Sequence, residues 1–247
     1  MSDDFLADQA ILDEIKNDIM NHSRNAARSK QKAIGPSEIA HPCARRVGYR
    51  LLEVEKTNFP DPWFTIIGTA THKWLEECYK AKNKALGFPR YLLEHRVKVH
   101  GGIGGKFDLF DTQTKSIRDW KIVGDSSIKR AKSKGSGAYS DQIAQYGLGL
   151  VAKGYQVDWV EIVYLPRNMT LRNAHIHREK FDPERARAIL SRHDEIKKTT
   201  KSHGIKALAL LPTTENFCDW CPYLLPGSPD LSIGCPGHIE GNEGVAA

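Results

Sequence analysis

The stretch from residue 104 to residue 121, GGKFDLFDTQTKSIRDWK, constrains the fold more than any other part of the chain. Two short β-prone runs, residues 106–110 and 117–123, flank a polar turn, and this pattern predicts a β-hairpin. Side chains alternate between the two faces of a strand, so Asp119 and Lys121 are predicted to point the same way. The hairpin therefore presents a carboxylate and an ammonium group side by side.

A second carboxylate lies on the neighbouring strand of this hairpin. Pairing across the turn brings Asp108 close to Asp119 and Lys121, although the sequence does not give the exact register. Glu94, on a strand predicted just before the hairpin, can face the same side in one of the possible registers. Two carboxylates in contact repel each other unless a cation lies between them, and Mg²⁺ or Mn²⁺ prefers such oxygen ligands. A protonated lysine beside the ion can orient or polarise a water molecule. The alternative is a solvated charge pair on an exposed strand.

Composition places the chain among ordinary globular proteins. Its 247 residues, 40% hydrophobic and 27% charged, suit one domain with a sizeable core and a small appended module. No apolar run approaches the ~18 residues that a membrane span needs, and the acidic N-terminus lacks a signal-peptide pattern. A cytoplasmic protein without a membrane partner is therefore expected. The net charge of +6 mildly favours a polyanionic partner.

Periodicity and breaker residues predict alternating helices and strands outside the hairpin. Helices are predicted over residues 5–30, 64–86, 139–153 and 182–202, and strands over residues 91–100, 157–165 and 174–181. Strand 157–165 is expected to run parallel to strand 117–123, with helix 139–153 as the crossover. Helix 64–86 carries His72, and it carries Cys78 on a core-type face, where we interpret it as a buried thiol.

Basic residues occur at two places where a phosphate backbone can bind. Arg45 and Arg46 lie in a segment near the N-terminus, where the alternatives are phosphate contact and a solvated face. A second basic run is predicted as a flexible loop after the hairpin, either as a DNA contact or as a merely solvated loop. Its basic side chains are Lys129, Arg130, Lys132 and Lys134.

Five cysteines in a chain expected to be cytoplasmic favour metal ligands or buried thiols over disulfides. The C-terminal segment carries Cys218 and Cys221 in a Cys-x-x-Cys pair, followed by Cys235, among prolines and glycines rather than periodic apolar residues. Three such thiolates can bind one metal centre. The fourth ligand is either Cys43, if the N-terminal region packs nearby, or His238 in the same segment.

Taken together, these residues resemble the PD-(D/E)XK nuclease superfamily, and in particular its RecB-like exonucleases of the iron–sulfur CRISPR-associated and phage-encoded type. The resemblance covers about residues 37–238 and depends on five short motifs. They are Gly68-x-x-x-His72, Gly105-x-x-Asp108, Asp119-Trp120-Lys121, Gln142-x-x-x-Tyr146, and Cys43 with the three C-terminal cysteines. Each motif is weak alone, but five in the family's order are specific. One departure is the long interval between Cys221 and Cys235, which leaves iron–sulfur and zinc both open.

The resemblance implies an α/β fold with a mixed central β-sheet flanked by helices, that is, a restriction-endonuclease-like nuclease core. It implies an N-terminal helical region over residues 1–90, a nuclease core over residues 91–204 and a cysteine-rich segment over residues 205–247. These parts would form one compact domain, in which a cysteine-ligated cluster ties the N-terminal region to the C-terminus.

The resemblance also implies a role for each motif residue. The implied ligands of Mg²⁺ or Mn²⁺ are His72, Asp108, Asp119 and the carbonyl of Trp120. Lys121 would position the attacking water, and Gln142 and Tyr146 would hold the DNA strand or steady the site. The implied ligands of a structural 4Fe–4S cluster, or alternatively of Zn²⁺, are Cys43, Cys218, Cys221 and Cys235.

The predicted function is a metal-dependent DNA exonuclease that hydrolyses phosphodiester bonds, acting on single-stranded DNA or DNA ends in phage or prokaryotic recombination or repair. If the protein is phage-encoded, it would act in the host cytoplasm. The alternatives are a catalytically silent DNA-binding or scaffold protein and a processing subunit of a CRISPR spacer-acquisition complex. Homo-oligomers are compatible with each of these functions.

Overall fold

The computed structural model describes residues 3–26, 33–215 and 217–238. Its α-helices are α1 (Asp3–Asn25), α2 (Pro36–Ile39), α3 (Ala44–Leu51), α4 (Trp63–Leu86), α5 (Asp125–Lys134), α6 (Ala138–Val151), α7 (Pro183–His203) and α8 (Ala207–Leu210). Its strands are β1 (Tyr91–Leu93), β2 (Arg96–His100), β3 (Ile103–Lys106), β4 (Leu109–Asp111), β5 (Ser116–Val123), β6 (Trp159–Pro166) and β7 (His175–Lys180). Three 3₁₀ turns are η1 (Leu171–Asn173), η2 (Gly204–Lys206) and η3 (Cys218–Trp220).

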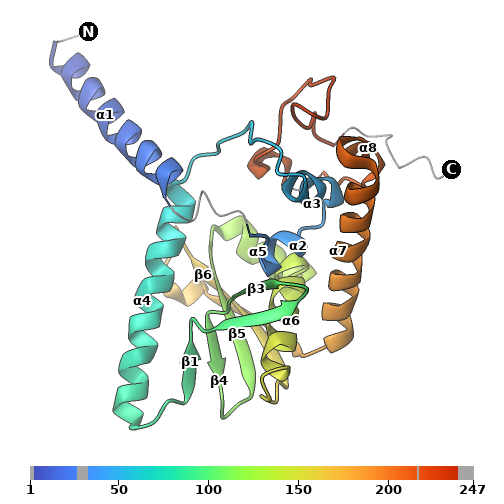
Figure 1. The fold of residues 1–247 in the computed structure, drawn as a ribbon. Coiled ribbons are helices and arrows are strands. Elements are labelled where there is room, and N and C mark those ends of the chain that lie inside the picture. The colour runs from blue at the N-terminus through green and yellow to red at the C-terminus, as the bar shows by residue number, and fades with distance from the viewer. Residues whose placement is uncertain (1–2, 27–32, 216, 239–247) are drawn as a thin grey trace.

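The main sheet is mixed, with strand order β1-β4-β5-β6-β7. The central pair β5 and β6 is parallel, and the other neighbouring pairs are antiparallel. The chain crosses from β5 to β6 through α5 and α6, as the sequence predicts for residues 139–153. The expected α/β architecture, a mixed sheet flanked by helices, is therefore confirmed (Figure 1).

The hairpin is less regular than the sequence pattern suggests. The first predicted strand is divided into β3 and β4, and Asp108 lies in the break between them. The predicted strand over residues 91–100 is likewise divided into β1 and β2 at Glu94, whose φ of 51° is in the left-handed region. Strands β2 and β3 then pair as a separate small sheet. At each break, a side chain that carries a carboxylate, Asp108 or Glu94, no longer follows the alternation of faces along a regular strand.

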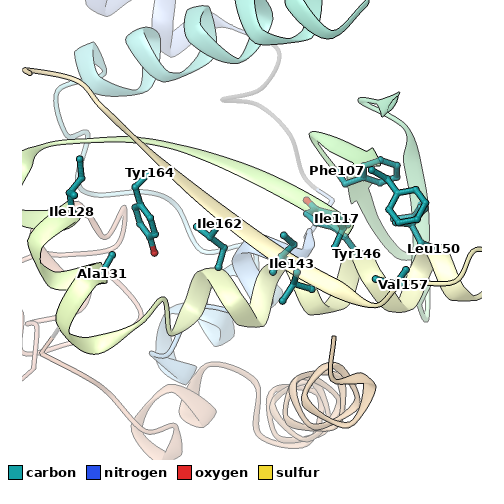
Figure 2. Packing of buried hydrophobic residues seen from close by; sticks show 13 residues of the cluster. Phe107, Ile117, Ile128, Ala131, Ile143, Tyr146, Leu150, Val157, Ile162 and Tyr164 are labelled. Carbon is teal, nitrogen blue, oxygen red and sulfur yellow. The ribbon is translucent and has the colours of Figure 1, made fainter. Parts of the chain in front are cut away.

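Helices cover both faces of the main sheet. On one face, α6 packs against buried side chains of the strands, as Figure 2 shows for Ile143 and Leu150 of α6 near Ile117 and Ile162. On the other face, α4 packs through Leu75 and other side chains against the sheet. Helix α7 packs against α6, and α1 projects away from the body of the molecule (Figure 1).

Two predictions of local structure are wrong. The basic run predicted as a loop is part of helix α5, because its apolar side chains Ile128 and Ala131 are buried in the main core. Cys78 is exposed on α4 rather than buried. The predicted helix over residues 5–30 appears as α1, and its last residues from 27 onward lie outside the described part.

Helix α3 and the residues that follow it pack against the C-terminal segment, above the sheet in Figure 1. Tyr49 of α3 stacks on Tyr223 with ring centroids 4.9 Å apart, and its hydroxyl donates to the carbonyl of Leu231 at 2.8 Å. Thr57 also donates to the carbonyl of Leu224. Among the described residues, no helix combines the length and the apolar character needed to cross a bilayer.

Candidate metal centre and cysteine pocket

His72 joins helix α4 to the sheet at the candidate metal centre. Its Nε2 lies 3.0 Å from the carbonyl oxygen of Trp120, and its Nδ1 lies 3.3 Å from Oδ1 of Asp108. Burial alone would lower the pKa of His72, but the carboxylates of Asp108 and Asp119 raise it above its ordinary value. Both ring nitrogens therefore face oxygen atoms that are themselves suitable ligands for a divalent cation.

One group of metal-ligating side chains gathers here among the described residues. A ligand atom of His72, of Glu94 and of Asp108 all lie within 4.8 Å of one another. Burial and the charge of Asp108 raise the pKa of Glu94, because two carboxylates share a poorly solvated space. The left-handed backbone of Glu94 and its N–H bond to the Asp108 carbonyl, at 3.2 Å, aim this side chain into the site.

Asp119 and Lys121 lie next to this group, on the face of β5 covered by α6. Asp119 is only 4% exposed, and its Oδ2 is 2.7 Å from Nζ of Lys121. Gln142 of α6 accepts from Lys121 at 3.1 Å and donates to Oδ1 of Asp119 at 3.4 Å. Burial raises the pKa of Asp119 to about 6, and Lys121 opposes this shift. Burial likewise opposes ionisation of Lys121, but the charge of Asp119 raises the pKa of Lys121 overall.

The remaining motif residues occupy different surroundings. The Trp120 backbone N–H donates to Oδ2 of Asp108 at 2.8 Å, which ties β5 to the break before β4. Tyr146 is only 6% exposed and lies in the core between α6 and the sheet (Figure 2). Its ring is therefore covered and cannot stack on DNA, so only its expected steadying role is compatible with this position. Burial raises its pKa to about 12, so the hydroxyl stays protonated.

The expected DNA-binding residues divide into buried and exposed groups. Arg45 is buried and donates from Nε to the carbonyl of Leu208 at 2.8 Å, so it is a structural residue rather than a phosphate contact. Arg46 is half-buried beside the cysteines. Lys129 is exposed and paired with Asp125 at 2.7 Å. The other exposed basic residues of α5 are Arg130, Lys132 and Lys134.

The comparisons with known proteins yield no match in sequence, and the solved structures described next are similar at low identity. No family model matches the chain, and no curated protein matches it. The alkaline exonuclease LHK-Exo of Laribacter hongkongensis is 11% identical, with 72% of this chain and 96% of that chain covered, at a TM-score of 0.43. A phage-related exonuclease of Haemophilus somnus 129PT is 15% identical, with 63% and 78% covered, at 0.43. LHK-Exo in complex with dAMP is 13% identical, with 68% and 95% covered, at 0.36. Likenesses at this level do not establish a family.

Four cysteines, one from near the N-terminus and three from the C-terminal segment, line one pocket. The pocket has an empty volume of about 370 Å³, part of it open to solvent. The cysteines at its wall are Cys43, Cys218, Cys221 and Cys235. All four are free thiols, and burial raises the pKa of Cys43 and Cys221. His238 also lines the pocket, but its Nδ1 is 3.0 Å from the hydroxyl oxygen of Thr213.

A half-buried imidazole, that of His41, completes the wall of this pocket. The backbone N–H of Cys43 donates to Nδ1 of His41 at 3.1 Å, so this nitrogen is an acceptor and the proton of the neutral ring lies on Nε2. Burial, aided by the charges of Arg46 and Arg192, lowers the pKa of His41 to about 4. The buried Nε2 has no hydrogen-bond partner in the described part of the chain. The pocket thus contains an unsatisfied donor beside four thiols.

Glu94 is the main site residue that sequence reasoning did not assign. It lies outside the five motifs, and its position depends on the kink between β1 and β2. The only signal in the sequence is an acidic residue within a β-prone run just before the hairpin. That signal indicates a possible face but not the left-handed turn that directs Glu94 toward His72.

Proposed function

We propose that this protein is a metal-dependent deoxyribonuclease that hydrolyses phosphodiester bonds from DNA ends. The observation that carries the proposal is the convergence of His72, Glu94 and Asp108 within 4.8 Å, beside the buried pair of Asp119 and Lys121. An ordinary solvated charge pair does not gather an imidazole and two carboxylates from three separate elements. The order of the five motifs points to the exonuclease branch of the superfamily.

The donor set fits Mg²⁺ or Mn²⁺. The residues that would hold the ion are His72, Glu94, Asp108, Asp119 and the carbonyl of Trp120. Carboxylate and carbonyl oxygens with one imidazole suit these hard cations. Burial, and then the charge of Asp108, raise the pKa values of Glu94 and Asp119, so a cation in the site would stabilise their ionised forms. A bound divalent ion supplies a Lewis acid for the phosphate and a water of lowered pKa.

The chain's own residues then orient the reacting groups. Lys121 is charged, because Asp119 raises its pKa, so it acts as a hydrogen-bond donor rather than as a base. From its position 2.7 Å from Asp119 and 3.1 Å from Gln142, it can position a water and stabilise charge that builds on the phosphate. Gln142 holds Lys121 and Asp119 in place through both ends of its amide. The exposed basic side chains of α5 provide phosphate contacts.

The deciding experiment is a time course on end-labelled single-stranded and duplex DNA with Mg²⁺, Mn²⁺ or chelator. We expect mononucleotides or short products to accumulate from the ends only when a divalent ion is present. A circular single strand of the same sequence is the matched control, because it has no ends. Cleavage of the circle would contradict the exonuclease mode, and unchanged activity in chelator would contradict metal dependence.

We also propose that the cysteine pocket holds a 4Fe–4S cluster with a structural role. Among the described residues, no three of the cysteine sulfurs lie mutually within 4.8 Å, whereas tetrahedral zinc at ~2.3 Å from each sulfur would draw them to about 3.8 Å apart. A cluster spreads its thiolates, because each binds a different iron. The unsatisfied Nε2–H of His41 suits a group that carries sulfur acceptors. Zn²⁺ remains the alternative occupant.

Purification without oxygen tests this second proposal. The expected protein is brown and absorbs near ~400 nm, and it carries about four iron and four sulfide per chain. A colourless protein with stoichiometric zinc would contradict the cluster but would leave the nuclease proposal intact.

A further inference from the structure

Two exposed aromatic rings and a half-buried arginine form a group at the start of α4. Phe64 is 43% exposed, and Trp220 of η3 is 51% exposed. Their ring centroids are 6.2 Å apart. The guanidinium carbon of Arg167 lies 3.4 Å from the centroid of the Phe64 ring. Phe64, Trp220 and Arg167 are called the aromatic platform below. Exposing large aromatic rings to water is unfavourable in free energy, and their grouping with an arginine indicates a binding surface.

The platform and the metal centre lie along the same helix. Phe64, Gly68 and His72 follow one another at intervals of four residues, so they lie along one side of α4. Eight residues of helix span ~12 Å, which is the length of a few nucleotides of one strand. A Cβ added to Gly68 would meet nothing within 4 Å, so the surface between the platform and His72 is open.

Arg167 connects the platform to the catalytic strand. It follows β6 directly, and its backbone N–H donates to the carbonyl of Val123, the last residue of β5, at 2.8 Å. β5 also carries Asp119 and Lys121. Arg167 is therefore fixed beside the end of the strand that carries the reacting groups. Its charge suits a phosphate, and its planar guanidinium already lies on an aromatic ring.

The cysteine segment holds the other half of the platform in place. Trp220 lies between Cys218 and Cys221, both at the wall of the pocket. Asn58, just before α4, donates from Nδ2 to the carbonyls of Asp219 and Cys221 at 3.2 and 3.0 Å. These bonds tie the segment that carries Trp220 to the segment that leads into Phe64.

We propose that the aromatic platform stacks an unpaired nucleobase of the single strand whose phosphodiester lies at the metal centre. The inference rests on the proposed nuclease function and deepens it, because it names unpaired DNA as the substrate class. Exposed rings accept any base by stacking, and the adjacent guanidinium accepts the phosphate that accompanies it. Bases within a duplex are stacked on each other and are not available to these rings.

A protein partner is the other occupant that exposed aromatic rings can accept. The arginine on Phe64 and the open surface toward His72 favour a nucleic acid strand, because both suit a chain of phosphates that continues to the metal centre. The experiment below separates the two, since a surface for a protein partner would leave the affinity for DNA unchanged.

The test measures binding without hydrolysis, in chelator, with a single-stranded oligonucleotide that carries 2-aminopurine near one end. Stacking on a ring quenches this base, so the full-length protein is expected to lower its fluorescence on binding. Phe64→Ala and Trp220→Ala are each expected to weaken binding about tenfold and to restore the fluorescence. Phe64→Tyr should retain both properties. Trp74→Ala is the matched control, because Trp74 is a 67% exposed ring elsewhere on α4.

Three results would overturn the inference: unchanged affinity in Phe64→Ala and Trp220→Ala, absence of quenching in the unsubstituted protein, or an equal loss in Trp74→Ala. Circular dichroism and thermal melting show whether each variant is folded. If Phe64→Ala is unfolded, Trp220→Ala and Phe64→Tyr keep the test decisive. The hydrolysis time course is independent of this measurement. Hydrolysis without stacking would refute the platform alone, whereas stacking without hydrolysis would refute the nuclease proposal alone.

Discussion

Oδ2 of Asp119 lies 2.7 Å from Nζ of Lys121, and the two groups form an ion pair that is largely withdrawn from solvent. Removing a carboxylate and an ammonium group from water costs free energy, and groups with shifted pKa values in such surroundings cluster at functional sites. Here the pair lies beside the group formed by His72, Glu94 and Asp108. Its position therefore links the cost to the candidate metal centre.

Replacing Lys121 by methionine should abolish most hydrolysis. The substitution keeps the length of the side chain and removes the donor that positions water and stabilises phosphate charge, so the rate should fall by about 10²–10⁴-fold. The measurement is release of label from DNA ends in Mn²⁺. Lys180→Met is the matched control, because Lys180 is exposed on β7 of the same sheet. Near-normal activity of Lys121→Met would contradict the assigned role.

Glu94→Gln should weaken metal binding. The substitution preserves shape and removes one of the two carboxylate charges that share the site with His72. We expect the affinity for Mn²⁺, measured by isothermal titration calorimetry, to fall by at least the ~10–100-fold typical of residues that support metal sites. Glu77→Gln on the exposed side of α4 should leave it unchanged. Equal affinities in the two variants would exclude Glu94 as a ligand.

The raised pKa of Asp119, about 6 against an ordinary 3.8, predicts a pH-dependent stability in the metal-free protein. The folded state holds this proton more tightly than the unfolded state. The contribution of Asp119 to the free energy of unfolding is therefore fully present below pH ~4 and declines as pH rises toward 6. Urea titrations in chelator should show that the stability difference between the unsubstituted protein and Asp119→Asn shrinks or reverses over this interval and is constant above it. A difference that grows with pH would contradict the shift.

The sequence predicts those parts of the site that depend on regular spacing. The two-residue repeat of β5 places Asp119 and Lys121 on one face, whereas the approach of His72 to Asp108 is implied only by the family resemblance. Glu94 depends on a left-handed kink that neither composition nor periodicity indicates. The site could therefore be predicted in outline, without the residue that completes its group of three.

Tertiary packing accounts for the positions that sequence reasoning misassigned. For Arg45 the sequence leaves phosphate contact and a solvated face open, but its guanidinium is buried against the carbonyl of Leu208, a residue remote in the sequence. The basic run after the hairpin became helix α5, because Ile128 and Ala131 have a core to pack against. In both cases local charge dominates the sequence pattern, whereas burial against a distant element decides the structure.

Gly68 offers a test of the open surface between the platform and the metal centre. Gly68→Ala should raise the free energy of unfolding by about 0.5–1 kcal/mol, because alanine favours a helix and its Cβ meets no other atom. Gly68→Trp should fold and bind Mn²⁺ normally, yet bind single-stranded DNA about tenfold more weakly, because the ring would occupy the strand's path. Chemical denaturation, calorimetry and fluorescence anisotropy provide the three measurements. Undiminished DNA binding by Gly68→Trp would show that the strand takes another route.

Cys235→Ser should lower the affinity for DNA, because the cysteine pocket helps to position the aromatic platform. Cys235 is buried, and its backbone N–H donates to the carbonyl of Tyr223 at 2.7 Å, within the segment that also fixes Trp220. Loss of one thiolate should remove the absorption near ~400 nm and lower the melting temperature, because the bound cluster contributes to folding. With Trp220 no longer held beside Phe64, affinity for the single strand should fall as in Trp220→Ala. Cys78→Ser, on an exposed thiol of α4, should change none of these properties. If Cys235→Ser loses the absorption but keeps full affinity for DNA, the cysteine segment supports the fold without positioning the aromatic platform.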